Sequence, residues 1–142
     1  MRFCSIASGS SGNCIYVGSE NTHVLVDTGI SGKKMEAGLN SLDLTGRDLD
    51  GILITHEHSD HIKGLGVISR KYGIPIYTTG GTVDAMVRTN SLGKIPDGIF
   101  HEIKEDEPFE IGDLTVNPFS IPHDAAQPVG YRLECDGHSV GI

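Results

Sequence analysis

The sequence contains no tryptophan, few other aromatic residues and no long apolar run. Its 142 residues include four tyrosines and four phenylalanines. No segment approaches the ~18 continuous apolar residues that a membrane-spanning helix needs. The first residues, Met1–Ser5, have the character of a strand rather than of a signal peptide. These absences predict a protein of the cytoplasm with no membrane partner.

Cysteine and basic residues are also scarce. The three cysteines, Cys4, Cys14 and Cys135, form no Cys-x-x-Cys pair, which predicts free thiols rather than a disulfide framework. Eleven Lys and Arg residues against nineteen Asp and Glu residues give a formal net charge of −8. A dedicated nucleic-acid-binding module is usually basic. A nucleic-acid substrate stays compatible with this charge, because bound cations can reverse the local sign of a site.

Glycine, in contrast, is abundant, and short β-rich segments alternate with segments of helical periodicity. Helical stripes begin near Ser31, Asp60 and Val83, and the second is expected to end at Gly73. Asp136-Gly137 predicts a tight hairpin. The pattern indicates one α/β layered domain with a mixed, partly antiparallel sheet. The expected strands are 2–7, 14–17, 23–27, 51–55, 74–78, 109–111, 114–121, 129–135 and 138–142.

The segment His56–His61 has the pattern H-x-H-x-D-H between an expected buried strand and an expected helix. His56 and His58, two positions apart, point the same way from an extended segment, and Asp60 and His61 lie at the start of the helix. Imidazole and carboxylate ligands suit zinc, iron or manganese, whereas closed structural zinc sites usually recruit cysteine. The segment therefore predicts an open metal site. The alternative is a histidine-rich surface loop.

Further candidate residues lie elsewhere in the chain. Ser11 and Asn13, in a glycine-rich turn, could offer hydroxyl and N–H groups to a phosphate, or could simply belong to a tight connection between strands. Asp27 follows the third expected strand and is predicted to orient a metal-bound imidazole, as nearby carboxylates commonly do. His123 is either a further metal ligand or an exposed loop histidine.

Together these motifs resemble those of the metallo-β-lactamase fold superfamily. The shared features are the pattern of His56–His61, the earlier Asp27-Thr28-Gly29 and the later His123, in this order. The segment Ser8–Cys14 is similar to that of the WalJ/YycJ-like branch, regarded as nuclease-type phosphodiesterases of the bacterial cytoplasm. The resemblance implies an αββα sandwich, and residues 1–142 are expected to be its truncated N-terminal half, a mixed sheet with helices on one face.

The resemblance also implies a set of ligands and a catalytic group. His56, His58 and His123 would hold one divalent ion, and Asp60 with His61 would hold a second. Zinc is the expected metal, with manganese or iron as alternatives. Asp60 would also accept a proton from the attacking water. Two ions suit phosphodiester hydrolysis, because they stabilise both the attacking and the leaving oxygen.

The resemblance thus implies a metal-dependent hydrolase, an exonuclease that cleaves DNA through a water activated by two metal ions. One alternative is an ester or thioester hydrolase similar to glyoxalase II. Another is an inactive metal-binding fragment, because the bridging aspartate and last histidine of the family would follow residue 142. Without them, weak binding or a single ion is expected. The uncovered face of one sheet is expected to favour self-association.

Overall fold

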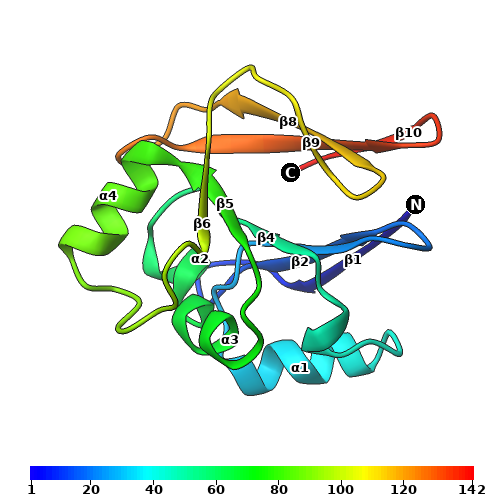
Figure 1. Ribbon diagram of the computed structural model, residues 1–142, viewed down its shortest axis with the longest axis horizontal. Coiled ribbons are helices and arrows are strands. Elements are labelled where there is room, and N and C mark those ends of the chain that lie inside the picture. Colours follow the sequence, from blue (N-terminus) through cyan, green and yellow to red (C-terminus); the bar gives the residue numbers. More distant parts are fainter.

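The computed structural model describes residues 1–142 as two facing β-sheets, with helices outside the first sheet (Figure 1). The first sheet contains, in spatial order, β1 (Arg2–Ala7), β2 (Cys14–Gly18), β3 (His23–Val26), β4 (Gly51–Leu53), β5 (Ile76–Thr79) and β6 (Phe100–Ile103). The second sheet has the spatial order β10-β9-β8-β7 and consists of β7 (Phe109–Ile111), β8 (Leu114–Ser120), β9 (Val129–Cys135) and β10 (His138–Gly141).

The first sheet is mixed, as predicted. Strands β1, β2 and β3 pair antiparallel, whereas β3 to β6 pair parallel. The parallel strands require crossover connections, and helices occupy most of these. The helices are nine residues long at most, and none of them is long and apolar enough to cross a membrane. They are α1 (Gly32–Asn40), the 3-10 helix η1 (Gly46–Asp48), α2 (Ser59–Ile62), α3 (Leu65–Tyr72) and α4 (Gly80–Arg88).

The central strands of the first sheet, β2 to β5, are buried on both faces and contribute to two hydrophobic cores. Leu25 and Ile52 belong to a core of 18 buried residues that includes side chains of the helices. Val26 and Leu53, their neighbours along the strands, belong to a core of 12 buried residues shared with the second sheet. Successive side chains of a strand point to opposite faces. This explains why the segment around β4 shows no alternation of apolar and polar residues.

The second sheet buries one face only. Along β9, Tyr131 and Leu133 are fully buried, whereas Arg132 between them is exposed. Arg132 and Glu134 form an ion pair of 3.0 Å on the outer face, and Phe119 is the large apolar side chain exposed there. This face carries no helix in the structure, but it is largely polar. Its composition therefore gives no support to self-association.

One helical segment differs from the sequence-based expectation. The single helix expected between Asp60 and Gly73 consists of two, α2 and α3, with Gly64 between them. The N–H of Gly64 donates to the carbonyl of Thr28 at 2.8 Å, and a Cβ at Gly64 would overlap the carbonyl oxygen of Ile30. This close approach interrupts the helix without interrupting its apolar periodicity. Gly73 ends α3 with φ of 64°, as predicted.

Candidate metal centre

The predicted metal ligands lie on two segments of the chain, one from each sheet. The segment that follows β4 carries His56 and His58 in a loop and Asp60 and His61 in α2, and the loop between β8 and β9 carries His123. The N–H of Val129, at the start of β9, donates to the carbonyl of Thr55 at 3.0 Å. This backbone hydrogen bond holds the two loops side by side. The site therefore lies at the carboxyl end of β4, where α/β sheets usually bind ligands.

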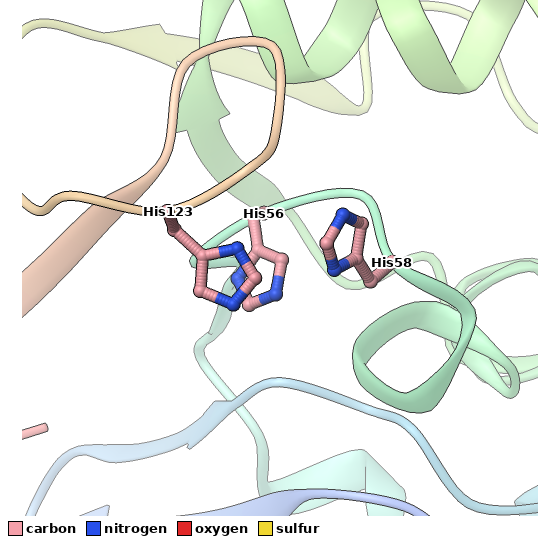
Figure 2. Close-up of side chains that lie close together, drawn as sticks. All are labelled: His56, His58 and His123. Atoms are coloured by element: carbon pink, nitrogen blue, oxygen red, sulfur yellow. The ribbon is translucent and has the colours of Figure 1, made fainter. Parts of the chain in front are cut away.

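His56, His58 and His123 form a triad of imidazoles. Each offers one ring nitrogen, and these three atoms lie within 4.8 Å of one another. Figure 2 shows the rings gathered in one place, with His56 and His58 from one loop and His123 from the other. The distances between ring centroids run from 4.3 to 4.9 Å. His56 is buried, His58 is half-buried and His123 is exposed, so the triad is accessible from one side.

The electrostatic environment of His56 fits a bound cation. Its Nε2 is buried and has no hydrogen-bond partner, while Nδ1 lies 2.9 Å from the hydroxyl of Thr55. Burial, assisted by the neighbouring imidazoles, lowers the pKa of His56 to about 4. The ring is therefore neutral at pH 7, and a lone pair is free. Leaving such an atom unpaired costs about 1–3 kcal/mol, which a divalent ion held by three imidazoles would offset.

Asp60 and His61 provide a second pair of donors beside the triad. Oδ2 of Asp60 lies 3.6 Å from Nε2 of His61, and the ring centroid of His61 lies 4.0 Å from that of His56. Nδ1 of His61 faces Asp27 instead. The structure thus brings all five predicted ligands to one place. Of these five residues, His56, His58 and His123 form the group whose ligand atoms all lie close enough to share one ion.

Asp27 lies behind His61 rather than among the triad. Its buried carboxylate accepts hydrogen bonds from the N–H and hydroxyl of Thr55, both at 2.8 Å, and lies 2.6 Å from Nδ1 of His61. Burial raises the pKa of Asp27, against the effect of these bonds. Burial would lower the pKa of His61, but the hydrogen bond and charge of Asp27 outweigh it and raise that pKa. A proton on Nδ1 leaves Nε2 with its lone pair, so that this atom can accept from a hydrogen-bond donor or bind a metal.

Replacing Asp27 with asparagine is expected to weaken zinc binding by roughly 10–100-fold, the usual effect of removing a carboxylate that supports a metal-bound imidazole. The amide would place an NH₂ group against a donor, either the backbone N–H of Thr55 at the Oδ1 position or the Thr55 hydroxyl and Nδ1 of His61 at the Oδ2 position. Titration of zinc against a chromophoric chelator measures the effect. Asp50→Asn is the matched control. The carboxylate of Asp50 also accepts a hydrogen bond from a backbone N–H, that of His23, but it precedes β4 and so lies at the end of the strand opposite the site. Equal affinity in the Asp27 variant and the wild type would contradict this role.

The β1–β2 loop reaches the same site through Asn13. Its backbone and side-chain N–H groups donate to the carbonyl of Asp60 at 2.8 and 3.1 Å. Nδ2 also lies 3.3 Å from Oδ2 of Asp60 and 3.3 Å from Nε2 of His61. Ser11 is exposed and makes no side-chain hydrogen bond. The phosphate contact expected of Ser11 and Asn13 stays a prediction, and the observed contacts show that Asn13 holds Asp60 at the start of α2.

Gly29 allows three segments to meet beneath the site. Its N–H donates to the carbonyl of Asn13 at 2.8 Å. A Cβ at this position would overlap the carbonyl group of Asp60 and would lie 2.8 Å from the backbone nitrogen of Asn13. Only glycine fits such an approach of backbone to backbone. The glycine of Asp27-Thr28-Gly29 therefore has a packing role that the sequence motif alone does not reveal.

Sequence reasoning missed two residues that contact the site, Thr55 and Glu57. The hydroxyl of Thr55 contacts both Asp27 and His56. The carboxylate of Glu57 accepts a hydrogen bond from the N–H of Ala126 at 2.9 Å. Both residues adjoin His56 in the sequence, which was the only indication that they belong to the site. Their hydrogen-bond partners could not be inferred from the sequence.

A cleft of about 340 Å³ opens beside His56 and His61. Its lining includes the polar residues Asn13, Asp27 and Thr55 beside the two histidines, together with an apolar part. The apolar part consists of Ile15, Phe119, Ile121, Val129 and Ile142, with Gly130 and Gly141. The candidate site therefore has both metal-binding groups and adjacent space for a substrate.

Comparison with known proteins agrees with this geometry. The family model of the metallo-beta-lactamase superfamily matches residues 7–141. The exodeoxyribonuclease YycJ of Bacillus anthracis is 44% identical over 142 residues, which are 100% of this chain and 53% of that protein. The exodeoxyribonuclease WalJ of Streptococcus pneumoniae is 41% identical over 138 residues, 97% of this chain and 51% of that protein. The chain spans about half the length of these curated relatives.

Solved structures show the same fold at low sequence identity. A HARLDQ-motif metallo-beta-lactamase mutant of Cronobacter sakazakii superposes with a TM-score of 0.81 at 15% identity, covering 97% of this chain and 57% of that one. A subclass B3 metallo-beta-lactamase from a soil metagenome library has a TM-score of 0.73 at 20% identity, with coverages of 92% and 55%. The match to the family model, the identity to the curated relatives and the shared fold agree: the chain belongs to the metallo-beta-lactamase superfamily.

Proposed function

We propose that the chain forms part of a metal-dependent hydrolase, an exonuclease that cleaves phosphodiester bonds of DNA. The observation that carries the proposal is the triad of His56, His58 and His123, with the buried, unpartnered Nε2 of His56 at its centre. The two relatives named exodeoxyribonucleases, both bacterial, match at least 97% of this chain and support the choice of DNA. A DNA substrate is consistent with the cytoplasmic location expected from the sequence.

The proposed ligand set divides the site into two positions. The triad holds one divalent ion, and Asp60 with His61 holds a second, with zinc as the first expectation and manganese or iron as alternatives. Ions bound there supply Lewis-acid chemistry, activating water and stabilising charge on the phosphoryl oxygens. The hydrogen bond between Asp27 and His61 orients the imidazole of the second position.

Asp60 has a further proposed role as the proton acceptor. Its side chain is 33% exposed, so that water reaches the carboxylate. Two hydrogen bonds from Asn13 hold its backbone carbonyl in place. We infer that Oδ2 of Asp60 takes the proton of the water that attacks phosphorus. We also propose that Asn13, which contacts Asp60 and His61, and Ser11 of the same loop contact a phosphate of the substrate.

A second candidate function is hydrolysis of a small ester or thioester. The apolar part of the cleft, with Ile15 and Phe119, supports this alternative, because it suits an acyl group better than a phosphate. A third outcome is a chain that binds metal without turnover, which its length of about half that of the curated relatives would explain.

Elemental mass spectrometry of the dialysed protein tests the metal site first, and a bound divalent metal is expected. Cleavage of end-labelled single-stranded DNA with that metal then tests the activity, both for residues 1–142 and for a longer native chain that contains them. His58→Ala is expected to lower the rate at least about hundredfold, since a metal's Lewis-acid contribution amounts to several kcal/mol. If the wild-type chain cleaves DNA no faster than the His58→Ala variant, the nuclease proposal is contradicted. If it hydrolyses thioesters but not DNA, the second candidate function is favoured.

A further inference from the structure

The carboxylate of Glu57 joins the two loops that carry the triad. Glu57 lies between His56 and His58 in the sequence, and its Oε2 accepts a hydrogen bond from the N–H of Ala126 at 2.9 Å. Ala126 lies three residues after His123 in the other loop. This is the only side-chain hydrogen bond between the two loops. A change at Glu57 therefore acts on the position of one loop relative to the other.

The loop of His123 has few other restraints near the histidine itself. His123 is exposed, and its ring makes no hydrogen bond. Farther along, the side-chain oxygen of Gln127 accepts from Gly81 at 2.9 Å, and its carbonyl accepts from Thr79 at 2.8 Å. Those bonds anchor the loop to the start of α4 and not to the other histidines. Glu57 is thus the side chain that ties the His123 loop to the loop of His56 and His58.

The chemistry of Glu57 is better suited to this bridge than to stabilising the fold. A carboxylate accepts a stronger hydrogen bond from a backbone N–H than a neutral group does. Its other oxygen, Oε1, is buried without any partner, and an unpaired buried oxygen carries an uncompensated desolvation cost. A smaller or apolar side chain would avoid that cost but would leave Ala126 without its acceptor.

We propose that Glu57 is a positioning residue, which fixes His123 at the distance from His56 and His58 that a shared divalent ion requires. Glu57 itself lies outside the triad of nitrogen atoms. The inference rests on the proposed metal site. It assigns the second residue of H-x-H-x-D-H a part in metal binding through its hydrogen bond to the opposite loop.

Zinc affinities of Glu57 variants, measured by competition with a chelator, test this inference without any activity assay. Glu57→Ala is expected to bind zinc about tenfold more weakly, at the lower end of the effects seen for groups that orient ligands. Glu57→Gln keeps an oxygen that can accept from Ala126 and is expected to stay within a few-fold of the wild type. Asp124→Ala is the matched control, because it removes an exposed carboxylate of the same loop that makes no hydrogen bond.

A double-mutant cycle with His123→Ala separates positioning from a general loss of structure. Without His123 there is no ligand to position, so Glu57→Ala should cause no further loss of zinc affinity in that background. Equal losses in both backgrounds, or wild-type affinity in Glu57→Ala, would overturn the inference and leave the metal site standing. A wild-type chain that binds no zinc would overturn the proposed metal site, and the inference with it.

Discussion

His123→Ala is expected to lower the affinity for zinc by at least about hundredfold, because loss of a direct ligand should exceed the roughly 10–100-fold effect of losing a supporting group. The substitution removes one of three converging nitrogen donors. It should leave the metal-free fold intact, since the ring of His123 is exposed and makes no hydrogen bond. A loss of metal binding can therefore be separated from a loss of folding.

Unfolding with and without zinc measures this difference. At a zinc concentration of 100 times the dissociation constant, the wild-type chain should gain about 2.7 kcal/mol of stability. The His123 variant, with an affinity at least about hundredfold lower, should gain about 0.4 kcal/mol or less at the same concentration. The two metal-free proteins should unfold alike. His138→Ala, another exposed histidine, on β10, serves as the control. Equal stabilisation of the His123 variant and the wild type would show that zinc binds elsewhere.

Gly29→Ala is expected to destabilise the protein by about 3 kcal/mol or more, at the upper end of the cost of overpacking. The added Cβ would overlap the carbonyl group of Asp60. That carbonyl cannot move away freely, because it accepts the hydrogen bond of the Asn13 N–H at 2.8 Å. Gly29 in turn donates to the carbonyl of Asn13 at 2.8 Å. Relief of the overlap would separate the segments that support the metal-binding loop.

Urea unfolding of the metal-free proteins measures the cost. Gly141→Ala is the matched control, because a Cβ at Gly141 has no atom within 4 Å and its φ is not positive. The control should stay within about 0.5 kcal/mol of the wild type, as substitutions in open space usually do. A Gly29 variant as stable as the control would mean that the three segments tolerate more separation than the structure indicates.

The fold could be predicted from the sequence to a large extent, because its signals are local. The mixed sheet, the helical stripes and the turn at Asp136-Gly137 follow from periodicity and turn chemistry, whereas the helices on one face were expected from the resemblance to the superfamily. The structure has φ of 49° and 79° at the two turn residues. The break at Gly64 could not be predicted. There the N–H of Gly64 bonds to the carbonyl of Thr28 and the backbone lies close to that of Ile30, both distant residues in sequence, while apolar periodicity continues unchanged across the break.

The candidate site divides in the same way. The segment His56–His61 can be recognised from the sequence alone, because four side chains of types that commonly bind metals occur within six positions. Thr55 and Glu57 could not be identified, since their significance lies in partners 28 and 69 residues away. A hydroxyl or a carboxylate beside a histidine is common in any loop. Only the tertiary contacts distinguish a residue that orients a ligand from one that faces water.

The origin of the triad from two different sheets has a consequence for the mechanics of the domain. His56 and His58 follow a strand of the first sheet, whereas His123 belongs to a loop of the second. An ion bound by all three histidines would link the two sheets and stabilise their packing against each other. By thermodynamic linkage, tighter packing of the two sheets would in turn raise the affinity for the ion. The apolar packing between the two sheets would thereby help to set how tightly the site holds an ion.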